Sequence, residues 1–196
     1  AAGLILKSAL IGFVLAIGLP WLASLVIGKI NKKRRPEAEA RAKEQAQATI
    51  HAFSAAHPSW HLRMYETPAG FRLLAMHDVF DPAGEAAREA LAELSADKVF
   101  VRLCTIQGCF RARVSPKSWR MKYRAPLSLP KSKWPFPAEH LALRQQWIEA
   151  YDRHAPSYAS CRFIDTLGSR TTHPEAEAVR AVHDEYCHAH SDLPLA

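Results

Sequence analysis

The sequence lacks the short motifs by which several large enzyme classes are recognised. It contains no G-x-x-x-x-G-K-S/T phosphate loop, no G-x-G-x-x-G turn, no G-x-S-x-G elbow and no H-E-x-x-H helix. No internal repeat of useful length is present either. These absences count against nucleotide, acyl-transfer and metalloprotease chemistry, and they favour a protein that is not an enzyme. We therefore name no catalytic residue.

Cysteine is scarce, and no two cysteines form the C-x2-C pairs of a zinc ribbon. Two small groups remain as metal candidates, with zinc as the candidate ion and no cofactor favoured. Cys104 and Cys109 need further ligands from elsewhere, such as Cys161 or a histidine. A second group lies on one face of an expected helix, at i, i+4 and i+7, and consists of His183, Cys187 and His190. Buried small cysteines and surface histidines explain both groups without a metal.

Charge is absent from Ser8 to Gly28, a run of 21 residues between two lysines. As a helix this run spans about 32 Å, close to the thickness of a bilayer's hydrocarbon core. It predicts a transmembrane helix. Because basic residues follow it, we expect an outside N-terminus and a cytoplasmic C-terminal domain. Ser8, Gly12 and Ala16 recur every fourth position and favour a helix-packing stripe, although Gly and Ala are also common in membrane helices.

Acidic residues are absent between Asp97 and Glu139, and the chain as a whole has a formal net charge of +7. Within this stretch, residues 115–137 are rich in proline and predict a loop. Cations alternate there with aromatic rings, at Lys117, Trp119, Arg120, Lys122, Tyr123, Arg124, Lys131, Lys133 and Trp134. We expect this basic loop to bind an acidic protein surface or anionic lipid ahead of nucleic acid, since no nucleic-acid motif is present. The alternative without a partner is a solvated loop pinned by buried tryptophans.

The order of these features predicts three parts. Residues 1–28 form the transmembrane anchor, residues 29–58 a basic flank and helical stalk, and residues 59–196 a cytoplasmic α+β domain. The basic flank is followed by an alanine-rich stretch with strong helix formers, which we expect to end before Pro58.

Alternating apolar residues and turn signals predict the elements of the domain. Strands are expected at 60–65, 71–77, 98–104, 109–114 and 160–166, and helices at 81–95, 138–155 and 174–190. The fold class is therefore α+β, with an antiparallel sheet of two β-hairpins around a helix, β-β-α-β-β, and further C-terminal helices.

The second hairpin would place like charges opposite one another. In the expected register Arg102 faces Arg111, and Arg113 lies on the same side of the strand pair. Such pairs are unfavourable unless an anion, an acidic helix or solvent lies over them. We therefore expect these three arginines to join the basic loop in binding an anion or a partner, with plain solvation as the alternative.

Two stretches of the chain resemble a known group of proteins, namely YETPAGFRLLAMHDVFDP at 65–82 and ADKVFVRLCTIQGCFRARVSPKSWR at 96–120. These are uncharacterised bacterial single-pass inner-membrane proteins of unknown function. The resemblance covers the middle part of the chain and implies a bacterial inner-membrane setting. It brings no activity, cofactor or site residue with it.

The sequence thus predicts a non-catalytic accessory or assembly subunit in the bacterial inner membrane. It would dock to a larger membrane protein complex through its transmembrane helix and the basic loop. The first alternative is a membrane-tethered metal- or thiol-dependent protein, in which nearby arginines lower the thiol pKa of Cys104 or Cys109 and His77 acts as a base. The second alternative is a module that binds anionic lipid or nucleic acid.

Overall fold

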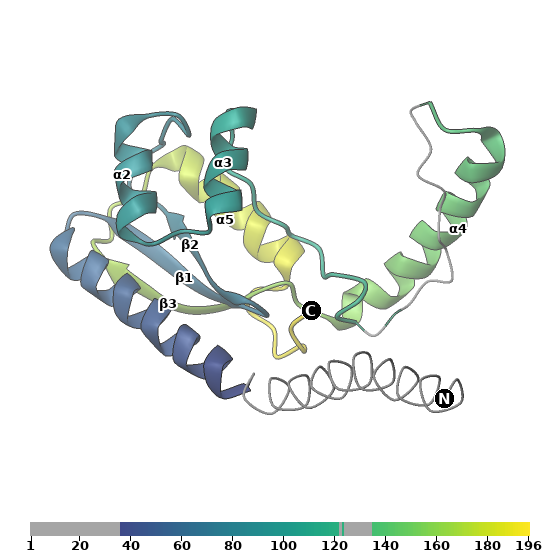
Figure 1. The fold of residues 1–196 in the computed structure, drawn as a ribbon, viewed down its shortest axis with the longest axis horizontal. Helices are drawn as coiled ribbons and strands as arrows, with labels where there is room; N and C mark the ends of the chain where they lie inside the picture. Colours follow the sequence, from purple (N-terminus) through teal and green to yellow (C-terminus); the bar gives the residue numbers. More distant parts are fainter. Residues whose placement is uncertain (1–35, 122, 124–134) are drawn as a thin grey trace, which may run out of the picture. The chain divides into compact units, whose positions relative to one another are not determined.

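The computed structural model describes residues 36–121, 123 and 135–196. The chain divides into two compact units, Ala1–Gln45 and Ala46–Ala196. Residues 36–56 are helical. The second unit is α+β and contains a three-stranded antiparallel sheet with helices (Figure 1). The expected division of the chain at residues 28 and 58 stays a prediction.

The sheet is built around its central strand. β1 (His61–Thr67) lies between β2 (Gly70–Ala75) and β3 (Arg162–Gly168), and both pairings are antiparallel. β1 and β2 form the first hairpin that the sequence predicts. Gly70 closes it at a φ of 144°, which a residue with a Cβ rarely adopts. β3 comes from far along the chain and begins two residues later than expected.

Both faces of the sheet are buried, and they bury different groups. Alternate residues of a strand point to opposite faces, so Leu62 and Tyr65 of β1 serve different clusters. Leu62 packs with Phe53 of the preceding helix. Tyr65 packs with Cys161 and Cys187. The face with the two cysteines is the one covered by the last helix, and it positions the site described below.

The pairing of β1 with β3 contains one irregularity. Met64 pairs with Asp165 and Tyr65 with Phe163, so Ile164 is an extra residue on β3. A bulge of this kind absorbs one residue and lets the strands on either side of it stay paired. The rings of Tyr65 and Phe163 remain on one face, with centroids 5.7 Å apart.

Four further helices are labelled in Figure 1, and their bounds are α2 (Glu85–Glu93), α3 (Lys98–Gln107), α4 (Ala138–His154) and α5 (Pro174–Cys187). A short 3-10 turn, Ala155–Ser157, follows α4. The helix expected from Asp81 begins later, at Glu85. The Asp81 carboxylate instead accepts a hydrogen bond from the Ala83 backbone N–H at 2.9 Å, and so holds the turn that precedes α2.

The second predicted hairpin is wrong, because its first strand is helix α3. Asp97 accepts a hydrogen bond from the Phe100 backbone N–H at 2.8 Å and caps the N-terminus. Gly108 ends the helix in the left-handed conformation, at a φ of 58°. The β-branched residues between these caps favoured a strand, but the caps fix a helix. The labelled elements therefore run β1-β2-α2-α3-α4-β3-α5, and the expected β-β-α-β-β sheet with Arg102 across from Arg111 is not formed.

The prediction of a membrane-spanning helix is also corrected. No helix within residues 36–121, 123 and 135–196 combines the length and apolar character needed to cross a bilayer. This finding contradicts the single-pass inner-membrane protein with an outside N-terminus and a cytoplasmic domain, and we do not carry that prediction further. The run Ser8–Gly28, with its stripe of Ser8, Gly12 and Ala16, lies outside the described residues.

Candidate functional site

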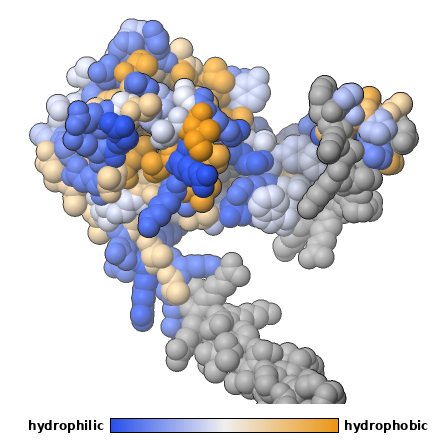
Figure 2. Space-filling model, turned by 45° about the horizontal axis from the view of Figure 1, so that its top comes forward, coloured by the Kyte–Doolittle hydropathy of each residue, from blue (hydrophilic) through white to orange (hydrophobic). Residues whose placement is uncertain are grey.

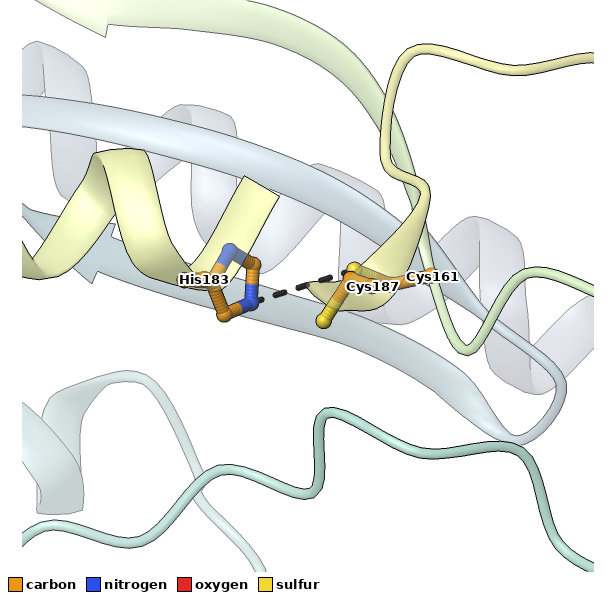
Figure 3. A group of neighbouring side chains, drawn as sticks. All are labelled: Cys161, His183 and Cys187. Carbon is orange, nitrogen blue, oxygen red and sulfur yellow. Dashed lines mark hydrogen bonds between the residues drawn. The ribbon is translucent and has the colours of Figure 1, made fainter. Parts of the chain in front are cut away.

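Three potential metal ligands meet between the sheet and α5. Cys161 lies immediately before β3, and His183 and Cys187 lie one turn apart on α5. All three residues are buried, and the two sulfurs and one ring nitrogen lie within 4.8 Å of one another. Figure 3 shows the imidazole of His183 turned toward both thiols, with its Nε2 3.8 Å from the Cys161 Sγ.

Backbone hydrogen bonds hold the two ligand-bearing segments together. The Ser160 N–H donates to the Cys187 carbonyl at 3.1 Å, and the Phe163 N–H donates to the Ala189 carbonyl at 2.8 Å. The chain beyond α5 therefore lies along the start of β3. Because both Cys161 and Cys187 belong to these bonded segments, their sulfurs are placed by the backbone as well as by side-chain packing.

Arg72 of β2 lies against the same cluster. Its Nη1 is 2.8 Å from His183 Nε2, 3.4 Å from Cys187 Sγ and 3.7 Å from Cys161 Sγ. Its Nη2 donates to the Arg113 carbonyl at 2.8 Å. A guanidinium keeps its protons in proteins, so His183 Nε2 accepts this hydrogen bond and carries no proton. In this structure, Arg72 is therefore the cation that contacts all three potential ligand atoms.

Asp184 orients the imidazole from the other side. Its Oδ1 is 2.9 Å from His183 Nδ1, which donates because Nε2 is the acceptor. The other oxygen, Oδ2, is held at 3.0 to 3.1 Å by a ring of side chains, Arg63, Arg180 and His190. A carboxylate that receives the second ring N–H is the usual support of a metal-binding histidine.

Hydrogen bonds favour the charged forms of Cys187 and Asp184. The hydrogen bond with Cys161 lowers the pKa of Cys187 to about 4, against burial, while the same bond and burial raise the pKa of Cys161. Burial acts to raise the pKa of Asp184, but its hydrogen bonds, led by that from His183, outweigh burial and lower the pKa to about 2. These contacts favour the thiolate form of Cys187, which has Arg72 and the Cys161 thiol beside it.

The structure brings together only part of each predicted metal group. His183 and Cys187 share the site, and they are joined there by Cys161. His190 lies instead on the outer side of Asp184, with its Nε2 3.1 Å from the carboxylate. Cys104 is buried on α3 and Cys109 is exposed after it, and neither belongs to the cluster.

The predicted anion- or partner-binding residues are only partly described. Arg102, Arg111 and Arg113 are exposed on α3 and just after it, and Arg111 donates to Gln107 at 2.8 Å. Trp119 is 64% exposed, so its ring does not pin the loop to the core.

The rest of that predicted surface has few described contacts. Lys117 and Arg120 are partly buried, with Lys117 Nζ 5.1 Å from the Trp119 ring centroid. The Tyr123 ring lies 4.6 Å from that of His154. The remaining candidates lie outside the described residues, namely Lys122, Arg124, Lys131, Lys133 and Trp134. Anion or partner binding by this set stays a prediction.

His77, the residue considered as a base, lies in an aromatic cluster. Its ring centroid is 4.5 Å from that of Trp60 and 5.3 Å from that of Phe80. The His61 backbone N–H donates to its Nδ1 at 3.4 Å. Neither Cys104 nor Cys109 is among the hydrogen-bond partners or ring neighbours of His77, so the structure gives no support to thiol chemistry with this base.

The environment of His77 predicts how stability depends on pH. Burial lowers its pKa below the usual value of 6.5, although Asp78 acts to raise it. The unfolded chain therefore takes up a proton before the folded chain does, and stability falls as pH drops below about 6.5. We expect His77→Phe, which keeps an aromatic ring, to flatten the loss of unfolding temperature between pH 7 and pH 5. An unchanged slope in thermal unfolding would contradict this.

Two central groups of the site escaped the sequence analysis. Asp184 is adjacent to His183 in the chain, and Arg72 alternates with residues that face the opposite side of β2. Strand alternation and the hairpin register place Arg63, Tyr65 and Arg72 on one face of the sheet. The sequence did not indicate that α5 covers this face.

The comparisons with known proteins add no relative. The chain matches no protein-family description, no curated protein and no solved structure.

Proposed function

We propose that the protein binds a zinc ion through Cys161, His183 and Cys187. One observation carries the proposal: three buried donors of the kinds that zinc prefers lie within 4.8 Å of one another, and one of them is oriented by a carboxylate. Zinc bonds of about 2.3 Å to sulfur and about 2.0 Å to nitrogen separate tetrahedral ligands by about 3.5 Å. The 3.8 Å between Cys161 Sγ and His183 Nε2 needs little adjustment.

The donor set suits zinc better than a harder ion. Two sulfurs and one imidazole are soft or intermediate ligands, whereas magnesium and calcium prefer oxygen. Three protein ligands leave a fourth tetrahedral position for water or another donor. Because the ligands come from the start of β3 and from α5, the ion would join two segments that lie more than twenty residues apart in the chain.

Charge is balanced in both states of the site. Without the metal, Arg72 neutralises the Cys187 thiolate. With zinc, both cysteines become thiolates and the divalent ion neutralises the pair. Arg72 Nη1, at 2.8 to 3.7 Å from all three donors, then has to withdraw, since two cations at this distance repel.

The proposal is tested by the metal content of the purified full chain. We expect about one zinc ion per chain by elemental analysis, and thiolate-to-metal charge-transfer absorption when cobalt replaces zinc. Cys161→Ser, His183→Asn and Cys187→Ser each remove a ligand and should abolish stoichiometric binding. Cys104→Ser and Cys109→Ser remove cysteines outside the cluster and should retain it. A metal-free chain, or equal binding by the two sets of variants, would overturn the proposal.

Arg72 provides a second prediction, because it competes with the ion for the same three donors. We expect Arg72→Gln to raise the affinity for zinc about tenfold, a gain of about 1.4 kcal/mol. Arg72→Lys retains the positive charge and serves as the matched control with a smaller effect. Titration of the full chain against a chromophoric zinc chelator measures both. Weaker binding by Arg72→Gln would mean that Arg72 supports the metal-bound state.

The same cluster also supports a second candidate, a reactive thiol. Cys187 has its pKa lowered to about 4 and lies 3.4 Å from the Arg72 guanidinium. Burial, however, denies it solvent contact, and buried cysteines are usually inert. The rate of alkylation of Cys187 in the folded chain by a small reagent decides between the two, since a zinc ligand is protected until a chelator is added. Docking to a larger protein complex stays a prediction.

A further inference from the structure

Helix α5 buries polar side chains and exposes large apolar ones. A surface helix normally turns its apolar residues toward the core. On α5 the buried positions include His183, Asp184 and Cys187. Large apolar side chains point outward at i, i+3 and i+7, where Val179 is 58%, Val182 56% and Tyr186 64% exposed. None of the described residues covers this outer stripe, so it is a surface available to a partner.

Helix α3 exposes a second apolar stripe. Of its ten residues, Cys104 alone is buried. The outward positions follow helical spacing and continue beyond the helix end, with Val99 65%, Leu103 38%, Ile106 67% and Phe110 46% exposed. Figure 2 turns the top of the Figure 1 view forward and shows hydrophobic side chains at the surface among hydrophilic ones.

The charges beside the two stripes are opposite in sign. α3 carries Lys98 and Arg102 and no acidic residue. α5 carries two exposed acidic residues beside its outer stripe, Glu175 and Glu185. An apolar helix face with basic flanks therefore occurs in the same chain as an apolar helix face with acidic flanks. Each face is complementary to the other in both hydrophobicity and charge.

The segment that follows α3 lies on the same side of the sheet as α5, where Val114 packs against the cluster of Tyr65, Cys161 and Cys187. The inner face of α5 contacts the sheet through Tyr65 and Arg72. Arg72 in turn donates to the Arg113 carbonyl, in the segment that follows α3 (Figure 1). Since α3 and α5 of one chain leave their stripes exposed, they do not satisfy each other within that chain.

We propose that this surface is a homodimer interface, in which α3 of one copy packs on α5 of a second copy and α5 on the second copy's α3. A two-fold axis makes both contacts from one self-complementary surface. It buries both stripes twice, and a specific interface needs roughly 1,000 Å² in total. The partner is thus a second copy of this chain, and the proposal does not depend on the zinc site.

The test uses charge-reversed variants of the full chain, sized by light scattering and sedimentation. The wild type should be a dimer that dissociates on dilution. Lys98→Glu with Arg102→Glu makes both helices acidic, and Glu175→Lys with Glu185→Lys makes both basic. Each pair of substitutions should weaken the dimer by at least about tenfold through like-charge contacts. Arg88→Glu, an exposed change on α2, is the matched control and should leave the dimer intact.

Restoring the dimer by combining the two charge reversals is the decisive experiment. Mixing the acidic α3 variant with the basic α5 variant should yield heterodimers, because both reciprocal contacts then join opposite charges. The chain that carries all four substitutions should dimerise again by itself. Ile106→Ser with Val182→Ser should give monomers without loss of helical circular dichroism. A wild type that stays monomeric at every concentration, or a dimer that none of these changes affects, would overturn the proposal and leave the surface to another occupant.

Discussion

Removal of zinc by a chelator is expected to lower the unfolding temperature of the full chain by about 10 °C. A ligand present at about a thousand times its dissociation constant stabilises the folded state by about 4 kcal/mol. For a chain of this size each kcal/mol shifts the midpoint by about 2–4 °C. At the proposed site the ion would join α5 to the residue before β3, so its loss should affect the whole second unit. Scanning calorimetry with and without chelator measures the shift.

The ligand variants provide the control for this result. Cys187→Ser should melt at the chelated temperature and should not respond to the chelator. Cys109→Ser, at an exposed position outside the cluster, should respond like the wild type. If the chelator lowers the midpoint of Cys187→Ser as well, the ion is bound elsewhere, and the site assigned to Cys161, His183 and Cys187 is wrong.

Asp184→Ala should be the most destabilising single substitution on α5, at about 3–5 kcal/mol. The carboxylate is only 6% exposed and joins Arg63, Arg180 and two histidines in one network. Removing one partner of a buried ion pair leaves the other charge unpaired in a poorly solvated place. Arg63 is the residue most affected, since its side chain is 15% exposed. Urea denaturation in the presence of chelator measures the loss without a contribution from zinc.

Glu177→Ala is the matched control for Asp184→Ala. Glu177 also pairs with Arg180, but its side chain is 48% exposed. An exposed ion pair contributes about 0–1 kcal/mol, so this variant should unfold close to the wild type. A loss of similar size in both variants would mean that Arg180, rather than burial of the carboxylate, determines the effect. A loss below about 1 kcal/mol for Asp184→Ala would show that the network is not important for stability.

The sequence predicted those elements whose signals are local. The first hairpin follows from a turn with Pro68 and Gly70 between two apolar runs, and α5 follows from Pro174 and the pattern after it. The error at α3 came from giving β-branched residues more weight than the caps. Asp97 and Gly108 stand at the right distance for a short helix, and this signal was present in the sequence.

The site was predictable only in the part that one helix contains. His183 and Cys187 are separated by four residues, so helical periodicity places them on one face. Cys161 and Arg72 come close to His183 and Cys187 only because β3 pairs with β1 and α5 packs over the sheet. Those contacts are long-range, and no spacing in a single sequence encodes them. The membrane prediction relied on residues 8–28 alone, and the described part of the chain did not bear it out.

Because of its extra residue, β3 should tolerate the deletion of one residue, which its neighbour β1 should not. Shortening the chain by deleting Ile164 would convert the bulge into a regular ladder, with Asp165 and Phe163 still across from Met64 and Tyr65. Cys161 would then stay on the α5 side. β1 has no extra residue. Deleting one residue from its middle would shift the register of half the strand, and the buried side chains of that half would then point to the opposite face of the sheet. Length variation in this sheet should therefore be confined to β3.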